Sequence, residues 1–355
     1  MKNRMKKLLA LALASVMTFS FTACGVGGEQ NKDNNGATPA PAATTVSATD
    51  ESVAQVPVAD GNHYTIGICQ LVQHEALDAA TQGFKDEIVE ELGEENVTFV
   101  EQNASGDSAQ CSVICTGFVS NKVDLILANA TPALQAASSS TGDIPVLGTS
   151  ITEYGVALAI DDFNGTVGGN VSGTSDLAPL DQQADMVVEL FPEAKTVGII
   201  YCTAEANSVY QANTVKKALE DKGLTVKVYT FTDSNDVASV TQKACDENDV
   251  LYIPTDNTAA SCTEAINNVA LPSKTPIIAG EEGIAKGCGV ATLSIDYYEL
   301  GRTTGKMAVK ILTGQSDISA MPVEYYTNPV KKYNAEICAE LGVEIPEGYE
   351  AIETE

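Results

Sequence analysis

Short apolar runs alternate with longer amphipathic runs from residue 64 onward, and this alternation constrains the fold more than any other feature of the chain. Strands separated by helical stretches of this length form parallel sheets that helices cover on both faces. The run Leu125–Ala128 is apolar throughout, as is typical of a strand buried on both faces. In the first half, the pattern predicts strands at 64–71, 97–102, 124–130 and 145–149 and helices at 76–92, 108–120 and 132–140.

The same unit occurs a second time along the chain. Its second copy predicts strands at 196–201, 225–230, 250–254 and 276–279 and helices at 208–222, 236–247 and 258–270. Three segments of the first half resemble three segments of the second in the same order: 65–68 and 196–199, 123–127 and 249–253, 144–147 and 275–278. The sequence therefore predicts an α/β protein with two doubly wound, Rossmann-like lobes. A single large sheet is the alternative.

We expect the chain to cross between these lobes three times, near 171–176, 291–296 and 322–327. The glycine-rich stretch Gly168–Thr174 suits a hinge because glycine tolerates backbone conformations that other residues avoid. The pattern also predicts a helix at 297–312 and a last helix near 334–341. The predicted boundaries are 62–174 with 297–321 for lobe 1, and 175–296 with 322–355 for lobe 2.

The N-terminus predicts export. A basic start is followed by an apolar run, Leu8–Phe21, which is too short for a membrane span, so residues 1–23 are interpreted as a signal peptide. Phe21-Thr22-Ala23-Cys24 resembles a bacterial lipobox, which predicts a lipid on Cys24 and anchoring to the outer face of the cell membrane. An ordinary secreted protein is the alternative. The remainder of residues 24–61 is rich in Asn, Gly, Pro, Ala, Thr and Ser and is predicted to be a disordered tether.

Charge and cysteine content narrow the classes of partner. A formal net charge of −28 argues against nucleic acid and anionic lipid, which require clusters of Lys and Arg. Eight cysteines follow Cys24, and they could form a disulfide framework. They are, however, spread thinly through apolar or helical segments, which favours buried free thiols. With His63 and His74 as its two histidines, the chain offers little for a metal site, and no cofactor is expected.

Candidate ligand-binding residues follow the predicted strands, because ligands of open parallel sheets bind beyond the carboxyl ends of the strands. Hydroxyls, amides and free N–H groups at helix starts suit a carboxylate, whereas Asp256 and Glu281 suit an ammonium group. Tyr154, Tyr201 and Tyr297 are candidate apolar walls, and His74 is expected at the edge of the cleft. Plain helix capping is the alternative for each Ser, Thr or Asn. The predicted ligand-binding residues are Gln70, Thr131, Thr149, Ser150, Tyr201, Asn207, Ser208, Asp256, Asn257, Glu281 and Asp296.

Several blocks resemble the tryptophan/tyrosine-type ABC-transporter substrate-binding proteins, and together they span the chain after the tether. They are residues 67–78, 130–133, 173–176, 205–208, 254–258, 279–283 and 295–302. The resemblance implies a type I periplasmic-binding-protein fold, an aromatic amino acid as the small-molecule ligand, and a permease and an ATPase as partners. A monomer that closes its lobes on the ligand is expected.

Other functions fit the sequence less well. It contains no Gly-x-Ser-x-Gly elbow, no phosphate-binding Gly-x-x-x-x-Gly-Lys loop and no histidine metal pair, so an enzyme is not expected. A nucleoside or a sugar is an alternative ligand, although the chain has no Trp for stacking on a sugar. A protein that senses its ligand and reports to a membrane receptor is a further alternative.

Overall fold

The computed structural model describes residues 63–353. The predicted signal peptide, Cys24 and the tether lie outside these residues. The first-lobe elements are β1 (Tyr64–Gln70), α1 (Glu75–Leu92), β2 (Val97–Asn103), α2 (Ser108–Asn121), β3 (Leu125–Asn129), α3 (Thr131–Ser140), β4 (Val146–Ile151), α4 (Tyr154–Leu158), β5 (Val171–Ser175), α11 (Tyr297–Leu312) and β11 (Glu324–Tyr325), with short 3₁₀ turns at Glu94–Asn96 and Ile318–Ala320. The predicted first-half elements are confirmed, with ends that shift by one or two residues.

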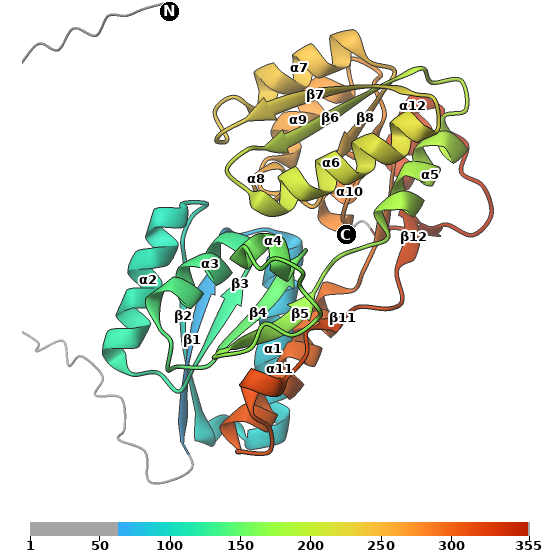
Figure 1. The fold of residues 1–355 in the computed structure, drawn as a ribbon. Helices are drawn as coiled ribbons and strands as arrows, with labels where there is room; N and C mark the ends of the chain where they lie inside the picture. Colours follow the sequence, from blue (N-terminus) through green and yellow to red (C-terminus); the bar gives the residue numbers. More distant parts are fainter. Residues whose placement is uncertain (1–62, 354–355) are drawn as a thin grey trace, which may run out of the picture. The chain divides into compact units, whose positions relative to one another are not determined.

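Within the described residues, the first sheet has six strands in the order β11-β5-β4-β3-β1-β2, and every pairing is parallel. Helices α2 and α3 cover one face, where Phe118 and Leu134 are fully buried (Figure 1). Helices α1 and α11 cover the other face, where Phe84 and Met307 are fully buried. This is the doubly wound arrangement that the alternation of strands and helices predicts.

The second lobe contains α5 (Leu180–Leu190), β6 (Thr196–Cys202), α6 (Ala206–Asp221), β7 (Thr225–Phe231), α7 (Val237–Glu247), β8 (Val250–Ile253), α8 (Asn257–Ala260), α9 (Thr263–Ala270), β9 (Ile277–Ala279), α10 (Glu282–Cys288), β10 (Ala291–Ser294), β12 (Val330–Tyr333), α12 (Ala335–Leu341) and β13 (Glu350–Ala351). Its described strands follow the order β13-β12-β10-β9-β8-β6-β7. From β6 to β10 this order repeats that of β1 to β5, which confirms the two-lobe prediction and excludes the single large sheet.

Two local predictions need correction. The helix expected at 258–270 is divided into α8 and α9, because the backbone at Cys262 leaves the helical region at φ −124° and ψ 21°. The segment 322–355 was assigned to lobe 2 as a whole, yet β11 within it pairs with β5 at the edge of the first sheet. Pairing with the second sheet begins at β12, which runs antiparallel to β10. The other lobe boundaries stay a prediction.

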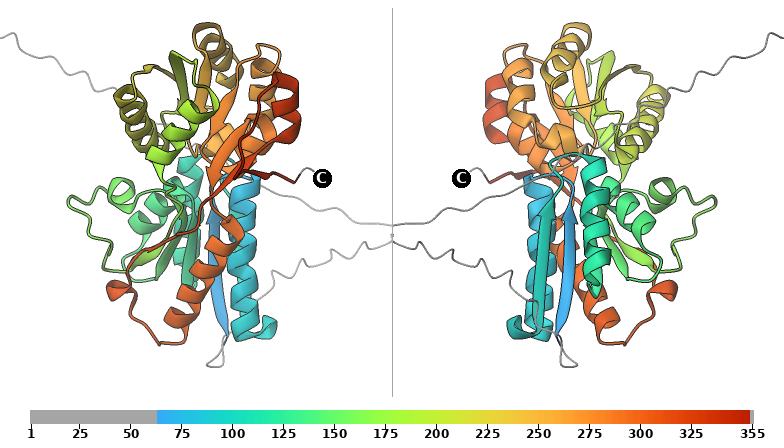
Figure 2. Two further views of the ribbon diagram at one scale, coloured as in Figure 1. Left: turned by 90° about the vertical axis from the view of Figure 1, so that its right-hand side faces the viewer. Right: turned by 90° about the vertical axis from the view of Figure 1, so that its left-hand side faces the viewer.

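Helices α1 and α11 pack at close range through glycines. A Cβ atom at Gly301 would overlap the carbonyl oxygen of Ala80, and one at Gly83 would overlap that of Tyr298. Figure 2 shows the two helices side by side, although more than 200 residues separate them in the chain. This packing fixes the start of α11, where the chain returns from the second lobe, against the first lobe.

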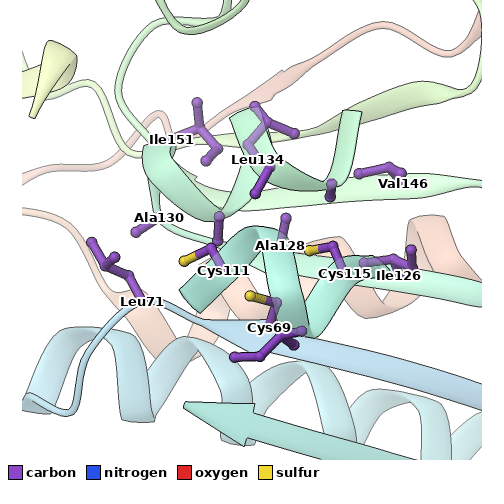
Figure 3. Close-up of a cluster of buried hydrophobic side chains, with 14 of the residues drawn as sticks. Cys69, Leu71, Cys111, Cys115, Ile126, Ala128, Ala130, Leu134, Val146 and Ile151 are labelled. Carbon is purple, nitrogen blue, oxygen red and sulfur yellow. The ribbon is translucent and has the colours of Figure 1, made fainter. Parts of the chain in front are cut away.

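The cysteines are free thiols, as the favoured interpretation predicts. All eight in the described residues are unpaired; seven are buried and Cys262 is half-buried. Cys69, Cys111 and Cys115 belong to the hydrophobic cluster between β1, α2 and α3 (Figure 3). Among residues 63–353, no three or more His, Cys, Asp or Glu side chains are placed to hold a metal. None of the described helices is long and apolar enough to cross a membrane.

Candidate functional site

The carboxyl ends of the strands in the two sheets face one shared hollow. In each sheet the strand order reverses at one point, between β1 and β3 and between β6 and β8, and ligands of doubly wound folds bind beyond the strand ends there. A hollow of about 160 Å³, hollow A, is lined from the first lobe by residues such as Leu71 and Pro132 and from the second by Cys202, Glu205 and Thr258. Both reversal points therefore border one space.

Two residues with unusual backbone conformations shape the first-lobe edge. Ala130, which directly follows β3, has φ 88°, and Ser150 in β4 has φ 57°; residues other than glycine seldom adopt such positive φ angles. Such strain collects at binding sites because the surrounding structure must hold it in place. The two segments are in direct contact, since the Ala130 N–H donates to the Thr149 carbonyl at 3.1 Å.

The hydroxyls beside this strain are buried and unsatisfied. Thr131 Oγ1, in the first turn of α3, and Ser150 Oγ have no hydrogen-bond partner among residues 63–353. A buried polar atom without a partner costs about 1–3 kcal/mol. Thr131 also begins a ten-residue helix whose first N–H groups favour an anion. The edge thus offers hydroxyl and N–H donors to a carboxylate.

Thr149 supports this edge from beneath. Its hydroxyl is fully buried and accepts hydrogen bonds from Thr304 Oγ1 at 3.2 Å and from Thr174 Oγ1 at 3.4 Å. These bonds join β4, β5 and α11. The ligand contact predicted for Thr149 stays a prediction.

Asp176 stands next along the same edge, directly after β5. Its backbone N–H donates to the Ile151 carbonyl, and Tyr297 OH donates to its Oδ2 at 3.0 Å. Its Oδ1 is buried and has no hydrogen-bond partner in the described chain. Burial raises the pKa of this carboxyl to about 6, although the hydrogen bond from Tyr297 opposes the rise. A ligand cation would relieve this desolvation.

Asn207 presents an unsatisfied acceptor from the second lobe. Its Nδ2 donates to the Thr255 carbonyl at 3.0 Å and lies 3.3 Å from Glu205 Oε2, which fixes the orientation of the amide. Its Oδ1 is consequently an acceptor, and it has no partner among the described residues. Ser208 beside it is fully buried and accepts from the same Nδ2.

Three polar contacts join the two lobes around these atoms. Gln211 Nε2 donates to Thr152 Oγ1 at 3.3 Å, and His74 Nε2 lies 3.2 Å from Asn257 Oδ1. The third contact is an ion pair of 2.9 Å between Lys286 Nζ and Glu75 Oε1. Of the predicted residues, Asn257 therefore takes part directly in a contact between the lobes.

Backbone N–H groups already bind the carboxylates of Asp256 and Glu281, the two predicted ammonium partners. Asp256 Oδ1 accepts from the Ala259 N–H at 2.8 Å, and its Oδ2 accepts from the Cys202 N–H at 2.7 Å. Glu281 accepts hydrogen bonds from the backbone N–H groups of Gly283, at 2.7 Å, and Ile284, at 2.5 Å. Burial raises the pKa of Glu281 to about 7 and also raises that of Asp256, to which the Glu205 charge contributes. This geometry favours helix capping for both.

The remaining predicted residues are spread around the cleft. Glu281 and Asp296 line a second hollow of about 220 Å³, hollow B, together with Tyr297; Asp296 itself is exposed and caps α11. Gln70 bonds within the first lobe, to Asp78 Oδ1 at 2.6 Å and to Thr81. Tyr201 packs against the second-lobe core. Their ligand contacts stay predictions.

Of the three candidate tyrosine walls, Tyr297 bonds to Asp176, the residue that carries an unsatisfied oxygen. Tyr154 is buried in the first-lobe core, where its hydroxyl donates to the carbonyls of Gly148 and Thr174. Asp176 was missing from the predicted site. The sequence offers one signal for it, an acid placed directly after the glycine-rich crossing.

Comparisons with known proteins identify the family of this chain. A model of the ABC transporter substrate binding protein family matches residues 65–353. The curated "Tyrosine-binding protein" of Clostridioides difficile is 35% identical over 325 residues, which cover 90% of this chain and 87% of that protein.

Solved structures extend the comparison to three dimensions. The ABC domain from Streptococcus pneumonia in complex with L-Trp has 33% identity and a TM-score of 0.78, and covers 82% of this chain and 100% of its own. The ligand-free, open structure of a substrate binding protein with adhesive properties from Clostridium difficile covers the same shares, with 37% identity and a TM-score of 0.63. A Bacillus halodurans protein with bound myo-inositol, at 18% identity and a TM-score of 0.56, shares the fold alone.

Proteins of this family bind transport substrates outside the cytoplasm and are not enzymes. This confirms the predictions that the protein acts outside the cytoplasm and that it is not an enzyme. The family match spans both lobes, and the solved relatives have the periplasmic-binding-protein fold. The chain belongs to the ABC transporter substrate-binding proteins.

Proposed function

We propose that the protein captures an aromatic amino acid between its lobes and delivers it to an ABC importer. The observation that carries this proposal is the set of unsatisfied buried atoms along the first-lobe edge. Thr131 and Ser150 supply hydroxyls and a helix N-terminus for the α-carboxylate, and Asp176 Oδ1 supplies an acceptor for the α-ammonium group. The two charged groups of an amino acid match these two neighbouring positions in sign.

The energy of such an arrangement suffices for capture. Each charge-assisted hydrogen bond contributes about 1.5–3 kcal/mol, and micromolar affinity requires about 8 kcal/mol. The names of two relatives support the aromatic class, since one is called a tyrosine-binding protein and another was solved with L-Trp.

Isothermal titration of the mature protein with the twenty amino acids, nucleosides and simple sugars tests the proposal. We expect micromolar or tighter binding of an aromatic amino acid. Asp176→Asn should weaken that binding by on the order of 30-fold or more, because removing one partner of a buried charge pair costs about 2–5 kcal/mol.

Glu281→Gln is the matched control, since Glu281 is also a buried acid after a strand but its oxygens are bonded to α10. It should retain the affinity. A protein that binds a sugar or a nucleoside and no amino acid would overturn the proposal.

Ligand binding is proposed to close the lobes about the three crossings. A ligand that bridges both lobes stabilises the closed state by its higher affinity for that state. The contacts of Gln211 with Thr152 and of His74 with Asn257 then form only when the lobes meet.

Membrane attachment is proposed to run through a lipid on Cys24, with residues 25–61 as the tether. More than one acyl chain would hold the protein stably, because a single chain binds a membrane only marginally. A permease and an ATPase are the proposed partners, and a monomer the proposed form. Mass spectrometry of the protein from membranes checks the anchor, with Cys24→Ala as the control that should appear in the medium.

A further inference from the structure

The ring nitrogen Nδ1 of His74 is buried near the cleft and plays no part in the binding proposed for the amino-acid head group. His74 follows β1 and stands at the N-terminal end of α1. Its Nε2 lies 3.2 Å from Asn257 Oδ1 across the lobes. Its Nδ1 is inaccessible to solvent, has no hydrogen-bond partner among residues 63–353 and does not cap α1.

The partner of Nε2 fixes which ring nitrogen carries the proton. Asn257 Nδ2 lies 2.6 Å from Glu205 Oε2, an oxygen that also accepts the Asn257 backbone N–H at 3.0 Å. The Asn257 amide is therefore oriented with Nδ2 toward the carboxylate and Oδ1 toward His74. An amide oxygen can only accept, so Nε2 of His74 donates.

The other ring nitrogen is then a bare acceptor. Burial lowers the pKa of His74, although the acids Glu205, Asp78 and Glu75 favour its charged form. In the neutral ring with a proton on Nε2, Nδ1 carries a lone pair. A buried acceptor of this kind needs a donor, which the described chain does not provide.

The strand order places this acceptor at a useful distance from the head-group positions. The edge runs β5, β4, β3, β1, with Asp176 after β5, Ser150 in β4, Thr131 after β3 and His74 beyond β1. Neighbouring strands lie about 4.8 Å apart, so β4 and β1 are separated by about 10 Å. A long, flat side chain that starts at Ser150 and Asp176 can extend along the edge toward His74.

Hydrogen bonds connect His74 to the second-lobe residues beside this edge. Glu205 Oε2 accepts from Asn257 and also from Asn207, so His74 and Asn207 connect through hydrogen-bonded neighbours. His74 itself lines a hollow with residues of α9 and α10, and this hollow shares Ser261 with hollow A.

We propose that His74 Nδ1 accepts a hydrogen bond from the far end of the ligand's side chain, the hydroxyl of tyrosine or the indole N–H of tryptophan. This contact selects both ligands over phenylalanine, which would leave the acceptor buried without a donor. Sites built to bond a ligand hydroxyl or N–H reject the analogue that lacks it. The inference rests on the proposed function and adds a specificity-determining residue to it.

Titration of wild-type protein and of His74→Phe with L-Tyr, L-Trp and L-Phe tests the proposal. In the wild type we expect L-Phe to bind on the order of tenfold to 100-fold more weakly than the better of the other two, the range set by one unsatisfied buried group. In His74→Phe this ratio should fall below about threefold. His63→Phe is the control, because His63 bonds Thr98 and the Glu95 carbonyl instead and should keep the wild-type ratio.

A spectroscopic measurement covers the case in which His74→Phe does not fold. With two histidines in the chain, the imidazole ¹⁵N resonances can be assigned with one variant of His63. In the closed complex with L-Tyr or L-Trp, where Asn257 meets His74, we expect a neutral His74 protonated at Nε2, and an Nδ1 resonance that is shifted from its position in the complex with L-Phe.

The outcomes separate the two proposals. Aromatic binding with a wild-type ratio near one, or an equal loss for all three ligands in His74→Phe, would refute the role of His74 and leave the proposed function standing. Absence of aromatic binding in the wild type would refute both. A proton on Nδ1 in the complex with L-Tyr or L-Trp would also overturn the assignment.

Discussion

Among the acidic residues of the cleft, Asp176 combines an unsatisfied oxygen with a titration near neutral pH. Burial raises its pKa to about 6 from 3.8. In the ligand-free protein, the folded state holds this proton more tightly than the unfolded state. The contribution of Asp176 to stability is therefore largest at low pH and is lost as the pH rises from 3.8 to about 6.

Ligand affinity should depend on pH with the opposite sign. The ammonium group binds the ionised carboxylate, so a proton competes with the ligand as the pH falls below about 6. We expect the dissociation constant to rise by up to about tenfold per pH unit in that range. Titrations at pH 5, 6, 7 and 8 measure this slope. Asp176→Asn should bind weakly at every pH, and a slope that persists in this variant would assign the titration to another group.

The structure places the predicted site residues at the strand ends, and it favours a different acid from those predicted as the ammonium partner. Thr131 and Ser150 were identified because they follow strands, and the structure brings them together. Asp256 and Glu281 are predicted for the same reason, yet backbone N–H groups bind their oxygens: those of Ala259 and Cys202 for Asp256, and those of Gly283 and Ile284 for Glu281. Asp176 could not be ranked above them, since its unsatisfied oxygen results from burial by α11, more than 100 residues away.

At the scale of elements, the capping acids should affect stability more than binding. We expect Glu281→Ala to lower the free energy of unfolding by about 1–2 kcal/mol, because it removes the acceptor for two N–H groups of α10. Urea denaturation measures this change. Glu282→Ala in the same turn is the control; it removes a half-exposed ion pair with Lys332 and should cost less than about 1 kcal/mol. Equal losses would argue against a capping role.

Several long helices and buried strands are predicted closely from the sequence. Strands β1, β3 and β8 and helices α1 and α11 were found to within one or two residues. Helix α10 was missed because it is seven residues long and contains Gly283 and Gly287, which lower helix propensity. Gly287 is needed there, since a Cβ atom at that position would overlap Thr263 of α9. Tertiary packing, which the sequence does not display, selects these glycines.

For the whole molecule, the ion pair between Glu75 and Lys286 tests lobe closure. It joins α1 to α10, and it should contribute only when the lobes meet. We expect Glu75→Lys to weaken ligand binding about two- to fivefold, the range of a partly exposed pair, with little change in thermal stability without ligand. Combining it with Lys286→Glu should restore most of the affinity. A double variant no better than the single one would contradict this role.

Duplication made the architecture of the molecule predictable. Three matched segments sufficed to foresee two sheets, and the strand order β2-β1-β3-β4-β5 is indeed repeated as β7-β6-β8-β9-β10. The inter-lobe contacts were not foreseeable, because Gln211 and Thr152, or His74 and Asn257, share no pattern in the chain. Contacts between distant surfaces depend on side-chain geometry rather than on period.

The glycine-lined packing of α1 against α11 has a consequence for the order of events in capture. His74 is fixed at the head of α1, and Tyr297, which holds Asp176, is fixed at the head of α11. The two helices pack in direct contact, so both ends of the proposed ligand path belong to the first lobe and should keep their separation when the lobes close. On the proposed path, the first lobe therefore sets the length of the amino acid that fits before closure, and the contact at His74 is completed when Asn257 of the second lobe closes onto it.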